Sequence, residues 1–176
     1  MTGQGDLDPD AWDALQRIIP IVCVDMLPVR LDESGRVSSI GLILRQVPHR
    51  EPAWCLVGGR VRYSETLAEA RTRQIEITLG SEVAGKTLLS GRPATVAEYA
   101  PSGAPRFNWD PRKHAVGITY LVELEGVPVP QGEALDFRWF EPESGLTRSQ
   151  VGFDQDQVID SCLASAEGGQ DERWWE

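Results

Sequence analysis

The chain has few of the residues that bind transition metals or form disulfides. Its 176 residues include only 2 histidines and 3 cysteines. The cysteines, Cys23, Cys55 and Cys162, are odd in number and form no short pair such as C-x-x-C, so neither a disulfide framework nor a zinc site is expected. We interpret them as buried, reduced thiols of a cytoplasmic protein.

Long apolar runs and a secretory leader are also missing. The longest apolar stretch, residues 18–29, is too short to span a bilayer and contains Asp25. The N-terminal residues are acidic and show no basic start followed by an apolar run. We therefore expect a cytoplasmic protein with no membrane partner.

Positive charge is scarce and unevenly placed. With 17 basic and 27 acidic residues the formal net charge is −10, which argues against nucleic acid as a partner, because phosphate neutralisation needs a basic face. Residues 40–115 nevertheless carry eleven basic and seven acidic groups, whereas both flanking segments are acidic. This excess is either ordinary surface scatter or a positive field around a site for an anion.

The length and apolar content favour one globular domain. A chain with 41% hydrophobic residues and 6 tryptophans can bury a core. We assign residues 11–166 to a single domain, residues 1–10 to a disordered start and residues 167–176 to a flexible tail. No internal repeat or linker interrupts the domain.

The hydrophobic periodicity predicts a mixed sheet with helices. Helical spacing is found after Asp8 or Asp10, which are candidate caps, and again after Ser64, up to a stop at Gly80. Residues 100–113 hold three prolines and a glycine and read as a long loop. The predicted helices are 11–19, 65–79 and 153–166, and the predicted strands are 18–31, 37–46, 53–57, 87–90, 95–99, 114–124 and 137–140, the first two forming a hairpin or adjacent strands.

One stretch, residues 57–80, organises the chain as a strand end, a glycine turn, a loop and a helix. Gly59, Glu65, Arg73 and Gly80 fall at the spacing of the signature of the Nudix hydrolases, which this stretch resembles. The resemblance implies an α/β/α sandwich with a mixed sheet. It also implies hydrolysis of a nucleoside diphosphate linked to another moiety, with Mg²⁺ held by glutamates of the signature helix.

Three acidic positions of that signature are not acidic here. They are occupied by Gln74, Ile77 and Thr78, so we expect weakened metal binding and assign no metal ligand. Glu69 and Glu76 cannot substitute, because at ~100° per residue they lie on a different helix face.

We interpret the face with Glu69 and Glu76 as solvated, with Arg73 as the i+4 partner of Glu69. Glu65 and Arg73 have a structural role in the family, bracing the loop against the helix. Gly59 suits a tight turn and Gly80 a helix stop.

A narrower resemblance is to the GDP-mannose mannosyl hydrolase branch, over roughly residues 12–145. It implies that Asp25 lies near a sugar and that Arg45 and Arg60 face a diphosphate, which forked guanidinium geometry suits. The alternatives are surface salt bridges for the arginines and a structural Asp–Arg pair for Asp25. The matching residues are Pro20–Asp25, Leu44–Arg45, Trp54, Gly58–Val61, Glu65–Leu67 and Asp136–Trp139.

The chain departs from this branch at its catalytic base. The branch has a histidine where this sequence has Glu133-Ala134-Leu135, and neither His49 nor His114 matches it. Glu133 could act as a base, although a carboxylate at the rim of the site is the simpler description.

The loop at residues 106–114 interleaves cations and aromatic rings. Trp109 could stack on a base while Arg112 and His114 meet the ligand, with Arg106, Phe107 and Lys113 beside them; the alternative is a solvated loop with one ring pinned to the body.

Three functions follow. The chain is a Nudix-like hydrolase of a nucleoside diphosphate derivative such as a nucleotide sugar, a non-catalytic module that binds such a ligand, or an interaction scaffold. The resemblance also implies a homodimer. The departures at Gln74, Ile77 and Thr78 favour the binding module over the hydrolase.

Overall fold

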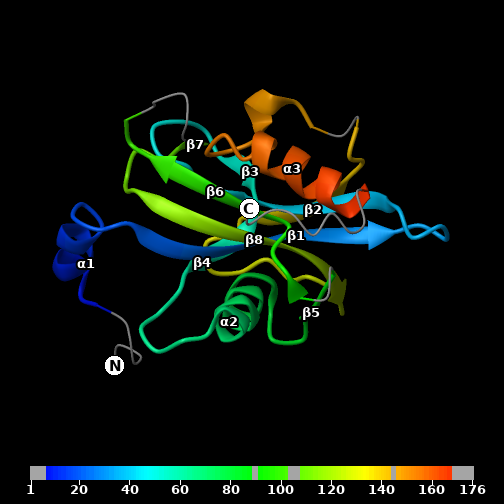
Figure 1. The fold of residues 1–176 in the computed structure, drawn as a ribbon, viewed down its shortest axis with the longest axis horizontal. Coiled ribbons are helices and arrows are strands. Elements are labelled where there is room, and N and C mark those ends of the chain that lie inside the picture. Colours follow the sequence, from blue (N-terminus) through cyan, green and yellow to red (C-terminus); the bar gives the residue numbers. More distant parts are fainter. Residues whose placement is uncertain (1–6, 89–90, 103–107, 144–145, 168–176) are drawn as a thin grey trace, which may run out of the picture.

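A mixed, curled sheet forms the centre of the molecule, with helices on both of its faces (Figure 1). The computed structural model describes residues 7–88, 91–102, 108–143 and 146–167. Helix α2 (Leu67–Leu79) and helix α3 (Asp156–Glu167) cover opposite faces, and α1 (Pro9–Leu15), capped by Asp8, lies at one end. The predicted α/β sandwich with a mixed sheet is confirmed.

Strand β1 (Ile21–Leu31) is the centre of the sheet. It pairs in parallel with β8 (Ala115–Glu125) and antiparallel with β2 (Val37–Arg45) and β4 (Val57–Arg60). Strand β1 therefore has three strands as hydrogen-bonded neighbours. The remaining strands are β3 (Ala53–Cys55), β5 (Ala84–Thr87), β6 (Thr95–Ala100), β7 (Asn108–Trp109) and β9 (Asp136–Phe140), and the main path of the sheet is β3-β2-β1-β8-β6-β7.

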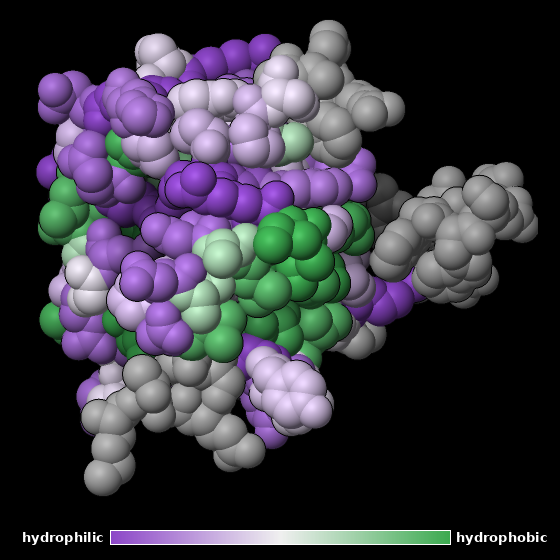
Figure 2. Space-filling model, turned by 90° about the vertical axis from the view of Figure 1, so that its left-hand side faces the viewer, coloured by the Kyte–Doolittle hydropathy of each residue, from purple (hydrophilic) through white to green (hydrophobic). Residues whose placement is uncertain are grey.

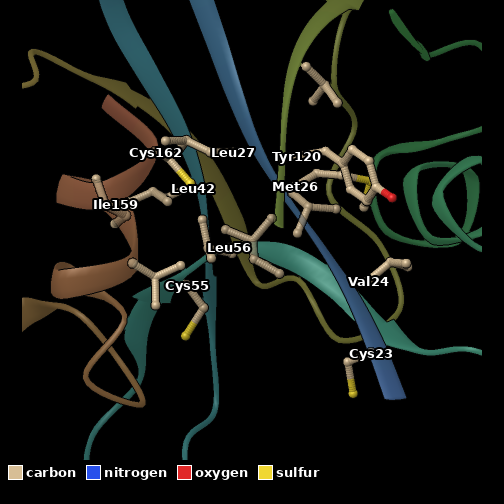
Figure 3. Packing of buried hydrophobic residues seen from close by; sticks show 14 of the residues in the cluster. Cys23, Val24, Met26, Leu27, Leu42, Cys55, Leu56, Tyr120, Ile159 and Cys162 are labelled. Atoms are coloured by element: carbon tan, nitrogen blue, oxygen red, sulfur yellow. The ribbon is translucent and has the colours of Figure 1, made fainter. Parts of the chain in front are cut away.

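Alternate residues of β1 pack against the two helical layers, as the period of a strand requires. Leu27 faces Cys162 of α3, whereas Met26 lies beside Tyr120 on the other face (Figure 3). Met26 and Leu27 are both 0% exposed, so β1 is buried on both sides. The cysteines Cys23, Cys55 and Cys162 are buried and unpaired, as predicted.

Helix α2 begins two residues later than predicted. The cap is Thr66, not Ser64, whose φ of 62° is not compatible with a helix start. Thr66 and Glu69 form a capping box, in which the Thr66 hydroxyl accepts from the Glu69 N–H and the Glu69 carboxylate accepts from the Thr66 N–H. The helix ends at Gly80, as predicted, with a φ of 100°.

The predicted strand at residues 53–57 is broken at Leu56. Its N–H donates to the Gln155 side chain at 2.9 Å instead of to a neighbouring strand, so the run divides into β3 and β4. The first predicted strand after α2 was placed at 87–90, but the structure has β5 at Ala84–Thr87. Gly85 in this strand leaves room for Ile75 of α2, whereas residues 89–90 lie outside the described residues.

Helix α3 starts at Asp156 and not at residue 153. Phe153 and Asp154 have φ values of 57° and 54°, which a right-handed helix does not allow. A short 3-10 helix, η2 (Arg148–Gln150), precedes this turn. Residues 1–6 and 168–176, most of the two predicted disordered ends, lie outside the described residues, as do Arg106 and Phe107.

Candidate functional site

The loop between β4 and α2 is held by a half-buried ion pair. Arg73 donates to both carboxylate oxygens of Glu65 at 2.6 and 2.7 Å, and to the carbonyl of Arg60 at 2.9 Å. The N–H of Arg62 donates to Glu65 at 2.8 Å. The Arg73 hydrogen bonds, more than any other contact, hold the pKa of Glu65 below its usual value. Glu65 and Arg73 therefore brace the loop against the helix.

Two glycines shape this loop–helix–turn unit. A Cβ at Gly59 would collide with the side-chain amide of Gln74, so α2 can approach β4 this closely only with glycine there. Gly80 donates its N–H to the carbonyl of Glu76 at 3.0 Å at the helix end.

Glu69 does not pair with Arg73, contrary to the prediction. The later helix start makes Glu69 the third helical residue, where its carboxylate accepts from the Thr66 N–H and hydroxyl at 2.8 and 2.7 Å. The Arg73 guanidinium is instead paired with the Glu65 carboxylate. Glu69 and Glu76 are exposed, so the solvated face is present without the predicted pair.

The three departures from the acidic signature form a surface unsuited to a divalent ion. Gln74 and Thr78 are buried, at 7% and 1% exposure, and Ile77 is 49% exposed. They offer an amide, an alkyl group and a hydroxyl where Mg²⁺ prefers carboxylates. Within the part of the chain that the structure describes, no group of three or more His, Cys, Asp or Glu side chains could hold a metal ion. The donor set therefore does not fit the magnesium that the fold family implies.

Asp25 occupies a slot between two glycines on the neighbouring strands. It lies opposite Gly58 of β4, where a Cβ would collide with its carboxylate. A Cβ at Gly117 of β8 would lie 2.5 Å from its Oδ2 and 3.1 Å from the Tyr99 ring. The carboxylate fits only because both neighbours lack side chains.

The Asp25 carboxylate is buried, and its pKa is shifted from the usual value. It is 8% exposed. Burial raises its pKa to about 6, while the charges of Lys113 and Arg45 act in the opposite direction and Glu133 raises it further. The structure therefore places a carboxylate that titrates close to neutrality beside two cations.

Arg45 and Arg112 flank the ring of Phe153. Their guanidinium carbons lie 5.8 and 4.7 Å from its centre. Arg45 is bound to Glu133 through contacts of 2.6 and 2.9 Å, which makes Glu133 more than a rim carboxylate. Each arginine at this end of β2 and β8 is therefore held on an aromatic surface with a carboxylate partner.

The partner of Arg112 is Asp110, through contacts of 2.8 and 2.9 Å. Asp110 is buried, and burial alone would raise its pKa, but the hydrogen bonds and charge of Arg112 bring that pKa below its usual value. The pair keeps both groups ionised.

Arg60 and Lys113 meet on the ring of Trp12 in α1. The Arg60 guanidinium lies 4.9 Å from the ring centre and the Lys113 amine 5.9 Å. Lys113 also acts on the pKa of Asp25, so this second aromatic surface adjoins the carboxylate slot. Trp12 lies outside the signature stretch, and its contacts with two cations have no sequence signal.

Two of the predicted site residues lie apart from the slot. Trp109 in β7 donates its N–H to Asp154 at 3.1 Å. His114 lines a different cleft of about 710 Å³ near α1, together with Arg17 and Ile18. Apolar and hydrophilic side chains lie side by side at this end of the molecule (Figure 2), where Ile18 is 77% exposed.

The predicted set is thus brought together in part. Asp25, Arg45 and Arg112 surround one region, Arg60 adjoins it through Trp12, and His114 lies in the α1 cleft. Sequence reasoning missed Tyr99 and Phe153, because they come from strands and turns distant in sequence and carry no motif. In the described residues no helix is long and apolar enough to cross a membrane.

A family model described as a domain of unknown function, DUF4916, matches residues 2–167. A structure from Jonesia denitrificans, described as a possible asymmetric diadenosine tetraphosphate hydrolase, is 37% identical, with a TM-score of 0.77 over 85% of this chain and 96% of its own. No curated protein matches the chain.

More distant structures share the fold. A MutT Nudix hydrolase from Burkholderia pseudomallei is 22% identical, with a TM-score of 0.62 over 84% of this chain and 98% of its own. A bifunctional NMN adenylyltransferase/ADP-ribose pyrophosphatase from Francisella tularensis is 17% identical, with a TM-score of 0.61 over 89% of this chain and 44% of its own. The chain therefore belongs to the DUF4916 family, and it shares the fold of solved Nudix hydrolases.

Proposed function

We propose that the chain binds a nucleoside diphosphate linked to a second group, at the end of the sheet around Asp25. The observation that carries this proposal is the Asp25 slot: a buried carboxylate with the charges of Lys113 and Arg45 beside it. A buried charge is costly to desolvate, and a ligand that donates hydrogen bonds to it would offset that cost.

The chemistry of the slot favours a ligand with hydroxyl groups and an anion. The Asp25 carboxylate can accept from sugar hydroxyls, while the neighbouring guanidinium groups suit phosphate oxygens. A nucleotide sugar combines both groups, and GDP-mannose is the first candidate because of the local resemblance to the hydrolases of that sugar nucleotide. Diphosphates of other nucleosides remain within the same class.

Hydrolysis of this ligand is the second candidate function. It is favoured by the pKa of Asp25, about 6, which suits a group that accepts a proton from water near neutral pH. The 37% identical protein described as a possible diadenosine tetraphosphate hydrolase supports a nucleotide-cleaving activity. The missing metal ligands argue against the usual metal-assisted route.

Thermal shift measurements with GDP, ADP, UDP and their sugars, each with and without Mg²⁺, test the proposal. We expect a nucleotide to raise the melting temperature, and Arg45→Gln to reduce that rise. Arg36→Gln is the matched control, since Arg36 lies on the β1–β2 turn. Release of sugar or phosphate would assign the hydrolase function, whereas no shift with any nucleotide would refute both candidates.

A further inference from the structure

A cleft of about 370 Å³ lies between the end of β4, α2 and the segment that follows residue 131. Three arginines line it, Arg60, Arg62 and Arg73, together with Glu133. Glu133 is itself neutralised by Arg45. The cleft is therefore a positive region in a protein of net charge −10. The other lining residues are Gly58, Gly59, Gln74, Ile77, Thr78 and Gly132.

The helix residues in the cleft are neutral. Gln74 lies over Gly59 so closely that a Cβ there would collide with it, and Thr78 is only 1% exposed. Glu65, the nearest signature glutamate, has both oxygens bound to Arg73. A divalent cation here would meet guanidinium groups rather than free carboxylates, and like charges repel it.

The main-chain carbonyls at the end of α2 are also occupied. Gln131 donates its side-chain amide to the Glu76 carbonyl at 2.7 Å and its N–H to the Thr78 carbonyl at 2.9 Å. Val129 donates its N–H to the Leu79 carbonyl at 2.8 Å. Unpaired carbonyls at a helix C-terminus attract cations, and here these groups already accept hydrogen bonds.

The same segment fixes the wall of the cleft. Gly132 has a φ of 61°, and a Cβ at this position would lie 2.9 Å from the Ile77 carbonyl. The next residue, Glu133, is bound to Arg45 of β2. The chain from residue 129 to 133 thus joins α2 to β2 and holds the cleft in one shape without a metal ion.

We propose that this cleft binds a phosphate group of the ligand directly, with the charges of Arg60 and Arg62 in the place that a divalent cation holds in a metal-dependent site. Guanidinium groups bind phosphate oxygens through paired hydrogen bonds, and the Gln74 amide is a neutral donor in the same cleft. Arg73 holds the Arg60 main chain at the cleft edge. This inference rests on the proposed binding of a nucleoside diphosphate derivative.

Isothermal titration of ADP, GDP and UDP in EDTA and again in excess Mg²⁺ tests the inference. We expect at least one of them to bind in EDTA. Hydrogen bonds to charged groups contribute about 1.5–3 kcal/mol, so Arg62→Gln should weaken this binding about 10- to 100-fold. The exposed Arg36→Gln variant is the control and should bind as the unmodified chain does.

A second variant adds a negative charge to the cleft. Gln74→Glu keeps the shape of the side chain but adds a carboxylate beside the guanidinium groups, so it should weaken binding in EDTA and regain it in Mg²⁺. Circular dichroism verifies that each variant is folded.

The outcomes separate the two proposals. Nucleotide binding that requires Mg²⁺ in the unmodified chain would overturn the metal-free cleft while leaving the proposed function intact. Equal affinities of the folded Arg62→Gln and Arg36→Gln variants in EDTA would place the phosphate elsewhere and also overturn it. Absence of binding with and without Mg²⁺ would refute the proposed function itself.

Discussion

Replacing Asp25 by asparagine should make the protein more stable at neutral pH. The folded state holds the Asp25 proton more tightly than the unfolded chain, because burial raises the carboxyl pKa from 3.8 to about 6. The stability that this tighter proton binding by Asp25 contributes is therefore fully present below pH 4 and is lost as the pH rises through 6. An asparagine of the same shape has no charge to bury.

The size of this effect follows from the same pKa values. A change in pKa from 3.8 to about 6 corresponds to about 3 kcal/mol, since a tenfold change in proton affinity is about 1.4 kcal/mol. Asp25 is 8% exposed, so solvent screening reduces this figure little. We expect the free energy of unfolding of Asp25→Asn, relative to the unmodified chain, to rise by about 3 kcal/mol between pH 4 and pH 7.5.

Urea denaturation followed by tryptophan fluorescence at several pH values measures this difference. Asp10→Asn is the matched control, because Asp10 is exposed in the first turn of α1 and its substitution should change stability by roughly 1 kcal/mol or less. A difference between Asp25→Asn and the unmodified chain that stays constant from pH 4 to pH 7.5 would show that the carboxylate is not destabilised by burial.

Three further changes test the framework around the site. Gln74→Glu with Thr78→Glu should create affinity for Mn²⁺ in titration calorimetry; a folded double variant that binds none would place the metal face elsewhere. Gly117→Ala should destabilise the chain by about 1–3 kcal/mol in urea, because its Cβ meets the Asp25 carboxylate, and Asp25→Ala in the same chain should recover most of that loss. Glu65→Gln should destabilise the chain by about 1.5–3 kcal/mol, because half-buried Arg73 loses hydrogen bonds to a charged partner, and an unchanged urea midpoint would contradict the bracing role.

Much of the fold was predictable because its signals are local. Gly80 ends α2, Asp8 caps α1, and the alternating runs that became β1, β2 and β8 are long enough for their periodicity to identify them. The break in the strand at residues 53–57 has a cause that is distant in the sequence. Leu56 breaks a strand because it bonds to Gln155, ninety-nine positions away, and such a contact has no signature in the sequence.

The site was predictable to a smaller extent. Asp25 stood out as a charge inside an apolar strand, and the structure gives it a buried slot. The two glycines that make the slot come from β4 and β8, and only strand pairing reveals that Gly58 and Gly117 flank the same side chain. Likewise, Lys113 and Arg60 share the Trp12 ring through tertiary packing alone.

The signature stretch combines a bracing framework, Glu65 and Arg73, with the helix positions that are acidic in the signature, Gln74 and Thr78 among them. Arg73 binds Glu65 and the Arg60 carbonyl, and none of these contacts involves a metal, so the loop–helix–turn holds its shape whether or not the helix carries further acids. The acidic positions face the cleft and contribute nothing to that bracing. The bracing therefore depends on Glu65 and Arg73 and not on acids at positions 74 and 78, so a matching framework is evidence for the architecture rather than for metal-dependent chemistry.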